Sequence, residues 1–370
     1  MTRTLSWLTG LLALVGLLAA CAGAPATQAP TTLAEIAPTA AAVATTAAEA
    51  APTAPAAAVD RTGWPATFRI GLFGGDDAGA VLNNAEPFRA LIEERLGIPV
   101  EIQTGTSYSA VIEAMRAGRV DAMEVGPFAY VLAVQEAGAE ALAVGIYPQD
   151  EENPVYDPET PSFYYSVYFT KKGSGINSVE DLRGTNFAFV DPASTSGHLA
   201  PKTGLIKAGI DPDTEMETVF AGSHPTAVLS VWNDTTQAGA TYEGNLYRLA
   251  SEGQIEFCGF PDGRSSVVRT PEEIQAVFDA CPDGHLVILG YSDPIPNTPF
   301  AVNSELPESF KAAVTELLLE VKDNPELIRS LKQWYDMPPA ELNLPTVDSY
   351  FNSLRDIARL LELDLKELGS

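Results

Sequence analysis

The chain has 370 residues, and its 49 Asp and Glu against 22 Lys and Arg give a formal net charge of -27. Such acidity argues against nucleic acid as a partner and against adsorption to an anionic membrane, although oriented donors in a pocket can still hold a small anion. Three histidines and three scattered cysteines show no metal-ligand spacing of the zinc type, so we expect neither a metal nor another cofactor.

The first twenty residues have the pattern of a secretory signal. Arg3 precedes an apolar run, Leu11–Ala20, that is too short to span a membrane. Leu18-Ala19-Ala20-Cys21 resembles a bacterial lipobox, which implies cleavage before Cys21 and lipid on its sulfur; the alternative is an ordinary signal peptide with a chance cysteine. We expect residues 1–20 to be a lipoprotein signal peptide. The mature chain is then exported and lipid-anchored to the outer face of the cell membrane or in the periplasm.

A spacer of simple composition follows. Residues 21–60 are almost entirely Ala, Pro and Thr and contain no aromatic residue, so they have little with which to build a core. Proline every few residues keeps such a chain extended. The composition predicts a disordered tether between an anchor and a folded part, and the remaining length of about 310 residues suffices for two lobes with sizeable cores.

Strand and helix patterns alternate in the first part of the folded region. Strands are expected at 67–72, 99–103 and 120–125, and helices at 85–96, 109–117 and 128–137. This alternation is typical of an α/β fold with an open parallel sheet, in which ligands bind beyond the carboxyl ends of the strands. Tyr108 follows the second strand, so it is either a ligand contact or a half-buried surface tyrosine.

The stretch with the strongest functional pattern follows a buried strand at 187–190. Asp191-Pro192 ends that strand, and Ser194, Thr195 and Ser196 come directly before a helix expected from Leu199 to Ile210. A helix start carries unsatisfied backbone N–H groups, and three hydroxyls add donors that can turn toward an oxyanion. The alternative is that one of them only caps the helix.

Two further strand ends in the same lobe carry polar residues. Ser223 and His224 follow a strand at 216–220 and precede a helix at 226–232, and a lone histidine there is either a ligand contact or a structural residue. Tyr242 and Glu243 follow a third strand end and are candidates for the far wall of a cleft. Glu243 is either an ordinary exposed carboxylate or the partner of an amino group on the ligand.

Cys258 and Cys281 remain as an even pair once Cys21 is assigned to lipid. In an exported chain such a pair favours a disulfide, here bracketing an insert with a helix-like segment at 271–280. The alternative is two buried thiols.

Two segments are expected to cross between the lobes and form a hinge. The β-prone run 163–170 leads from the first lobe to the second, and a strand at 286–292 leads back through 294–299. We therefore divide the folded part into residues 66–165 (lobe 1), 166–290 (lobe 2, with the 258–281 insert) and 291–370 (return to lobe 1). Its C-terminal helices are expected at 310 onward, 325–335 and 346–368, packed on lobe 1.

Several of these stretches resemble the phosphonate-binding family of ABC-importer solute-binding proteins. They are Asp-Pro-x-Ser-Thr-Ser-Gly from Asp191, Ala-Gly-Ser-His from Ala221, and Tyr-x-x-x-Ile-x-x-Met-Arg from Tyr108, within a similarity that runs from about Thr67 to about Leu306. The resemblance implies a type II periplasmic-binding-protein fold that captures a small phosphorus oxyanion (phosphonate, phosphite or phosphate) by lobe closure, without chemistry. It also implies an ABC permease and ATPase as partners; we expect a monomer.

The chain departs from the family pattern at two places. Val125 stands where the family often has an aromatic residue. Family members that hold an aminoalkyl phosphonate place carboxylates around its amino group; Glu243 matches one of these, but Asn297 and Thr298 occupy the position of another. The resemblance therefore implies a preference for phosphite, methylphosphonate or phosphate over 2-aminoethylphosphonate.

Other functions compete with this interpretation. Within the fold, the ligand could be a sulfonate or a phosphorylated vitamin precursor. An exported hydrolase would need a base beside the Ser-Thr-Ser turn, but His198 lies on the expected helix and no Gly-x-Ser-x-Gly elbow is present. A sensory ectodomain is a third candidate, but no spanning segment follows the domain.

Overall fold

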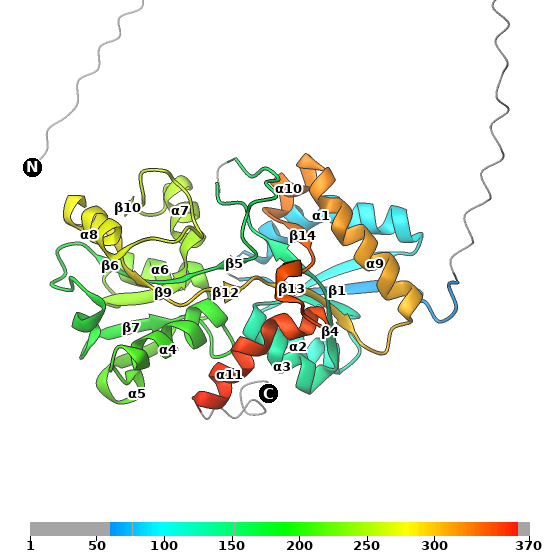
Figure 1. Ribbon diagram of the computed structural model, residues 1–370, viewed down its shortest axis with the longest axis horizontal. Helices are drawn as coiled ribbons and strands as arrows, with labels where there is room; N and C mark the ends of the chain where they lie inside the picture. Colours follow the sequence, from blue (N-terminus) through cyan, green and yellow to red (C-terminus); the bar gives the residue numbers. More distant parts are fainter. Residues whose placement is uncertain (1–59, 76, 151–152, 362–370) are drawn as a thin grey trace, which may run out of the picture. The chain divides into compact units, whose positions relative to one another are not determined.

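Two six-stranded sheets dominate the computed structural model, which describes residues 60–75, 77–150 and 153–361 (Figure 1). A short antiparallel pair, β5 (Phe163–Tyr164) and β12 (Ile295–Pro296), lies where the chain crosses between them. The predicted α/β fold of two open-sheet lobes joined by two strands is confirmed. The expected signal peptide, Cys21 and tether lie outside the described residues. Among the described residues, no helix combines the length and the apolar character needed to cross a membrane.

The sheet of lobe 1 has the strand order β14-β4-β13-β3-β1-β2. Its strands are β1 (Phe68–Phe73), β2 (Val100–Gly105), β3 (Ala122–Glu124), β4 (Ala139–Ile146), β13 (Pro299–Asn303) and β14 (Trp334–Asp336). β1 pairs in parallel with β2 and β3, whereas β13 and β14 run antiparallel to their neighbours. The carboxyl ends of β1, β2 and β3 consequently open at one edge of the sheet, as the sequence pattern predicts.

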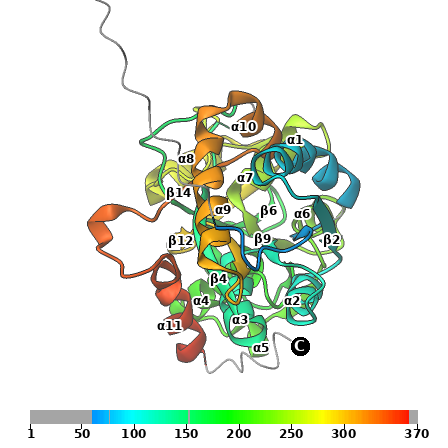
Figure 2. The ribbon, with the colours of Figure 1, turned by 90° about the vertical axis from the view of Figure 1, so that its right-hand side faces the viewer.

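Helices cover both faces of this sheet. The first face carries α1 (Ala78–Leu96), α9 (Glu308–Glu320) and α10 (Pro325–Leu331), which contribute Phe88, Phe310 and Leu327 to one core (Figure 2). The second carries α2 (Tyr108–Arg116), α3 (Pro127–Ala137) and α11 (Asn352–Leu360), whose apolar residues form a separate core. The C-terminal helices therefore pack on lobe 1.

The sheet of lobe 2 has the order β10-β11-β6-β9-β7-β8. Its strands are β6 (Ser166–Lys171), β7 (Asn186–Phe189), β8 (Glu217–Phe220), β9 (Ala238–Tyr242), β10 (Phe257–Cys258) and β11 (Leu286–Tyr291). The helices that pack on it are η1 (Val179–Leu182), α4 (Ala200–Lys207), α5 (Pro212–Glu215), α6 (His224–Trp232), α7 (Glu243–Ser251) and α8 (Pro271–Ala280). β7, β8 and β9 are parallel, so their polar carboxyl ends meet at one edge.

Several boundaries differ from the expectation. α1 begins seven residues early because Asp77 accepts a hydrogen bond from the Ala80 amide and starts a turn that the apolar periodicity does not mark. The helix expected at 325–335 ends at Leu331, since Lys332 adopts a left-handed conformation and β14 follows. The sequence pattern also missed β4, an Ala-rich run whose strand conformation is imposed by its pairing with β13 and β14.

The C-terminal segment is broken rather than continuous. Residues Val347–Phe351 form a 3-10 turn (η5) before α11 begins at Asn352. Tyr350 in this turn donates its hydroxyl proton to the Ser162 carbonyl beside the crossing strand β5, at 2.6 Å. The segment thereby ties the end of the chain to the crossing region.

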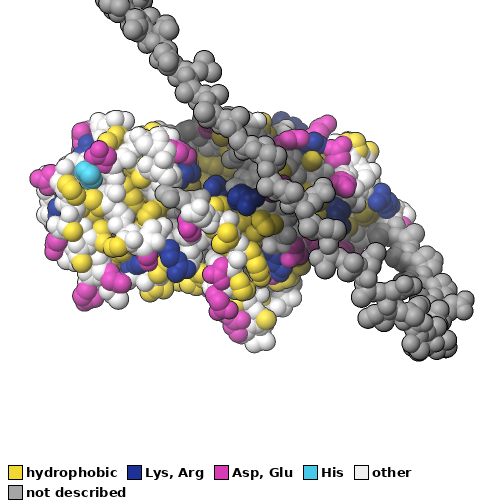
Figure 3. Space-filling view, turned by 90° about the horizontal axis from the view of Figure 1, so that it is seen from above, with side chains coloured by type: hydrophobic (Ala, Val, Ile, Leu, Met, Phe, Trp, Pro, Cys, Tyr) yellow, Lys and Arg dark blue, Asp and Glu magenta, His cyan; other side chains and the backbone are white. Residues whose placement is uncertain are grey.

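The described surface carries both signs of charge. On the face shown in Figure 3, Lys and Arg side chains lie among Asp and Glu side chains. Several are neighbours on one helix, such as Arg89 with Glu86, an arrangement worth only a few tenths of a kcal/mol. These surface pairs do not mark a site.

Candidate functional site

The Ser-Thr-Ser turn begins at Ser194, five residues after the last residue of β7, Phe189. The helix expected from Leu199 starts earlier, as a π-helical turn over Thr195–Leu199 that runs into α4. Ser194 caps this turn by accepting the Gly197 amide at 3.0 Å. Ser194, Thr195 and Ser196 are each at most 3% exposed, so three hydroxyls lie buried in the first turn of a helix. Capping of the helix accounts for the position of the Ser194 hydroxyl, but not for the burial of the Thr195 and Ser196 hydroxyls.

Lobe 1 presents a second helix start to this turn. Gly126 and Pro127 begin α3, and the Phe128 amide of its first turn donates to Thr195 Oγ1 at 2.8 Å. A Cβ at Gly126 would lie 3.5 Å from Thr195 Oγ1 and 3.6 Å from the Tyr108 ring, so residues of both lobes come within ordinary van der Waals distance of this position. The two lobes are therefore in direct contact at the turn.

Two tyrosines complete the wall opposite the turn. Tyr108 is the first residue of α2, stacks on Phe73 with ring centroids 4.2 Å apart, and hydrogen-bonds to Ser194. Tyr164, from the crossing strand β5, hydrogen-bonds to Ser196 and Thr195, and burial raises its pKa to about 12. Burial likewise raises the pKa of Tyr108, so both phenols stay protonated.

His224 closes the site from the next strand end. Its Nε2 lies 3.5 Å from Ser194 Oγ and its Nδ1 lies 2.9 Å from Thr241 Oγ1, which also accepts from Asn245 Nδ2. Burial, with a contribution from the nearby Arg248, lowers the pKa of His224 to about 3. The imidazole is thus neutral and can donate from only one nitrogen.

A cation stands behind the far wall. Arg248 on α7 donates to Asn245 Oδ1 at 2.9 Å and hydrogen-bonds to Tyr242, whose ring lies 4.8 Å from the His224 ring. Sequence reasoning placed no Lys or Arg within the site motifs. Arg248 could have been found from its spacing three residues after Asn245, because residues three apart on a helix are neighbours and this helix starts at the strand end that carries Tyr242.

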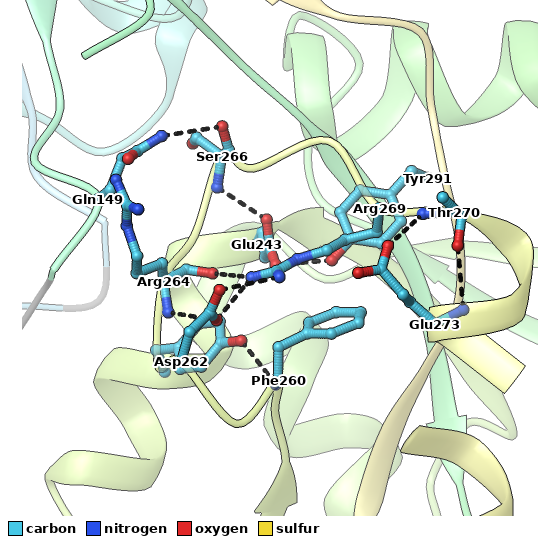
Figure 4. Close-up of polar contacts among 11 residues, drawn as sticks. Gln149, Glu243, Phe260, Asp262, Arg264, Ser266, Arg269, Thr270, Glu273 and Tyr291 are labelled. Carbon is cyan, nitrogen blue, oxygen red and sulfur yellow. Dashed lines mark hydrogen bonds and ion pairs between the residues drawn. The ribbon is translucent and has the colours of Figure 1, made fainter. Parts of the chain in front are cut away.

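Glu243 is not an exposed carboxylate, so that alternative is wrong. It is 1% exposed, and its two oxygens accept from the Tyr291 hydroxyl at 2.6 Å and from the Ser266 amide at 2.9 Å (Figure 4). Burial raises its pKa to about 7. Glu243 therefore engages the insert, while its neighbour Tyr242 lies beside His224.

The second crossing segment contributes a buried amide without partners. Asn297 is fully buried, and its backbone amide donates to the Ser162 carbonyl at 3.1 Å. Its side-chain Nδ2 and Oδ1 have no hydrogen-bond partner among the described residues. Buried amides normally satisfy both groups, so Asn297 is suited to a polar molecule held near the crossing strands. The adjacent Thr298 hydrogen-bonds to Tyr147, another aromatic residue that the sequence analysis did not select.

The chemistry available is that of neutral donors. Hydroxyl, phenol, imidazole and amide groups converge on the turn, and within the described residues no cluster of His, Cys, Asp and Glu is arranged to hold a metal ion. The nearest serine-histidine pair, Ser194 and His224, is at the limit of hydrogen-bonding distance. The arrangement is suited to binding a compact anion by many short contacts.

Comparisons with known proteins identify a family. Residues 70–341 match the family described as the ABC transporter, phosphonate, periplasmic substrate-binding protein. The phosphate-import protein PhnD of Mycolicibacterium smegmatis is 30% identical over 188 residues, which are 49% of this chain and 56% of that protein. The phosphonates-binding periplasmic protein of Escherichia coli is 25% identical over 245 residues, 65% of this chain and 62% of that protein. These alignments span less than two thirds of either relative.

A solved structure shows the same fold. PhnD1 of Prochlorococcus marinus, in complex with methylphosphonate, superposes with a TM-score of 0.60 over 80% of this chain and 99% of that chain, at 16% identity. At such low identity the likeness concerns the fold, which is the expected type II periplasmic-binding-protein fold.

Proposed function

Because the chain belongs to the ABC-transporter phosphonate periplasmic substrate-binding family, we propose that it captures a small phosphorus oxyanion between its two lobes. It then delivers this phosphonate, phosphite or phosphate to an ABC permease driven by an ATPase. It acts by binding and lobe closure and performs no chemistry on the ligand. The relatives named for phosphate import and for methylphosphonate support this class of ligand.

The observation that carries the proposal is the burial of three consecutive hydroxyls at a meeting of two helix starts. Ser194, Thr195 and Ser196 lie in the first turn before α4, and the Phe128 amide lies in the first turn of α3. The backbone N–H groups and the positive end of the helix dipole favour an anion at both helix starts. A phosphoryl group has enough oxygens to accept from several of these donors together.

The ligand takes over contacts that now join the protein to itself. In the described structure Tyr108 forms a hydrogen bond with Ser194, and Tyr164 forms hydrogen bonds with Ser196 and Thr195. A hydroxyl has one donor and two acceptor sites, so Thr195 can accept from Phe128 and still donate its proton to a ligand oxygen. His224 and Tyr108 donate from neighbouring walls.

Recognition by neutral groups favours oxygen geometry over net charge. The neutral imidazole of His224 and the protonated phenols each offer a directed donor, whereas a flexible ammonium acts as a point charge. Arg248 polarises the far wall through Tyr242 and Asn245 without occupying it. The site thus selects a compact tetrahedral oxyanion.

Two features of this assignment concern the amine end of larger phosphonates. Asn297 is a neutral amide where an aminophosphonate binder needs a carboxylate, and the Glu243 carboxylate is held by Tyr291 and Ser266. Ligands without an amino group are therefore preferred.

The protein is a monomer, exported and anchored by lipid on Cys21, with residues 21–60 as the tether.

Isothermal titration calorimetry with phosphite, methylphosphonate, phosphate, 2-aminoethylphosphonate, sulfate and methanesulfonate tests the proposal. We expect saturable binding of the phosphorus oxyanions, with the sulfur oxyanions weaker. Tighter binding of methanesulfonate would make the chain a sulfonate-binding protein. Release of nitrophenolate from a chromogenic phosphate ester, abolished by Ser194→Ala, would make it a hydrolase.

A further inference from the structure

The insert between Cys258 and Cys281, whose sulfurs form a disulfide, is packed firmly on lobe 2. Phe260 lies in the core beneath β6 and β11, and the Arg269 guanidinium stacks over its ring at 4.1 Å. Arg269 is only 7% exposed in its side chain and donates to both Asp262 oxygens, at 2.9 and 2.7 Å. The base of the insert is therefore a rigid part of lobe 2.

The tip of the insert contacts a segment that belongs to lobe 1. The Ser265 amide donates to the Gln149 carbonyl at 3.0 Å, and Asp150 and Arg264 form an antiparallel bridge. Gln149 Nε2 also lies 3.5 Å from the Ser266 carbonyl oxygen (Figure 4). Gln149 comes only three residues after β4, which pairs with β14 and β13 in the lobe 1 sheet.

The same tip is tied to the wall of the ligand site. The Ser266 amide donates to Glu243 Oε2, and Glu243 directly follows Tyr242 at the end of β9. Ser266 has a φ of 59°, in the left-handed region that side chains other than glycine seldom adopt. Its conformation is therefore held by the contacts on both sides, with Glu243 on one and Gln149 on the other.

We propose that the insert is an interlobe latch, in which residues 264–266 of lobe 2 hold Gln149 and Asp150 of lobe 1 and so stabilise the closed arrangement. The latch is separate from the contact between Thr195 and Phe128 at the ligand site. Opening the lobes breaks both contacts. The latch therefore adds to the barrier against opening, and it slows ligand escape without touching the ligand.

The latch requires only that the lobes open and close, which is the part of the proposed function on which it rests. Exchange of the Phe128 amide with deuterium reports lobe opening in the absence of any ligand, since this amide is bonded across the lobes. This measurement tests whether the latch resists lobe opening, even if the chain binds no phosphorus oxyanion. Dissociation of phosphite or methylphosphonate in stopped flow is the second measurement.

The first test locks the latch. Partners in an antiparallel bridge have Cα atoms close enough for a disulfide, so the double variant Asp150→Cys/Arg264→Cys can be oxidised to a crosslink. It is made in the full chain with Cys21→Ser, and each single variant serves as a control. We expect the crosslink to slow Phe128 exchange and ligand dissociation roughly tenfold or more. Rates equal to those of the single variants would show that the two segments move together and would overturn the proposal.

The second test weakens the latch. Ser265→Pro removes the amide that Gln149 accepts from, whereas the matched variant Ser265→Ala keeps that amide and removes only the hydroxyl. A cooperative thermal unfolding transition establishes that each variant has folded. We expect faster Phe128 exchange in Ser265→Pro than in Ser265→Ala. Equal rates in two folded variants would overturn the proposal, and if the proline variant does not fold, the crosslink decides.

Discussion

The Phe128 backbone amide of lobe 1 donates a hydrogen bond to Thr195 Oγ1 of lobe 2 at 2.8 Å. This hydrogen bond joins the two lobes directly, between residues that are 67 positions apart in the chain. In the proposed function, one threonine couples the ligand site to lobe closure, because the same hydroxyl accepts from the opposing helix start and can donate to the ligand.

Thr195→Ala should weaken the binding of every phosphorus oxyanion by roughly tenfold or more, because the lost hydroxyl would donate to the head group that all of them share. Thr195→Ser is the matched control, since it retains the hydroxyl and loses only a methyl group. Calorimetric titration with phosphite and methylphosphonate measures both variants. Unchanged affinity in the alanine variant would show that Thr195 does not contact the ligand.

Asn297→Asp should reduce the difference in affinity between 2-aminoethylphosphonate and methylphosphonate, as measured by calorimetric titration. A carboxylate in this buried position gives the ammonium group a charge-assisted partner worth about 1.5–3 kcal/mol, which the native amide does not supply. In the native chain the aminophosphonate should bind more weakly than methylphosphonate. A native titration series in which 2-aminoethylphosphonate binds tightest would contradict this assignment.

Glu243 predicts a pH dependence of stability. Burial raises its pKa to about 7 from an ordinary 4.5, so the folded chain keeps a proton that the unfolded chain has already released. Stability is therefore lost as the pH rises from about 4.5 through about 7. The groups that face it are Tyr291, Arg269, Asp262, Tyr247 and Tyr165.

Glu243→Gln removes this titration while keeping the shape of the side chain. Denaturant unfolding of both proteins from pH 4.5 to pH 8 should show the difference in unfolding free energy shifting in favour of the variant as the pH rises. A difference that stays constant over this range would mean that Glu243 does not titrate there.

The insert should depend on its disulfide. Non-reducing peptide mapping should join Cys258 to Cys281, and reduction should lower the melting temperature, because closing a loop of this size contributes on the order of 3 kcal/mol. A Cys258→Ala/Cys281→Ala variant should melt where the reduced protein melts. Two alkylatable thiols in protein recovered from an oxidising compartment would refute the pairing.

Cys21 should decide where the exported chain resides. If the proposed lipid anchor holds the chain, Cys21→Ser should move the protein from the membrane fraction to the soluble fraction, because the apolar run before Cys21 would be removed with the signal. Fractionation of wild type and variant measures this. A wild-type protein that is already soluble after export would contradict the lipoprotein assignment.

Local sequence determined the elements with strong patterns and the family. The buried strand before Asp191, the hydroxyl run after it and the Ser-His strand end are contiguous, and their chemistry follows from side chains that are neighbours in the chain. The family expectation was confirmed because it rested on such contiguous motifs. β4 and β14 were not recognised, since their strand conformation depends on pairing with strands distant in sequence.

Only the tertiary structure decided which side chains share a site. Tyr164 and Asn297 belong to two crossing segments more than a hundred residues apart, and the sequence alone does not show that Tyr164 reaches the Ser-Thr-Ser turn or that the Asn297 side chain is buried without a partner. Glu243 illustrates the same limit in reverse: its strand-end position suggested either solvent or ligand, and the structure gives it Tyr291 and Ser266 instead. A side chain's partner is set by the packing of whole lobes, because hydrogen bonds act over about 3 Å while sequence patterns describe only one element at a time.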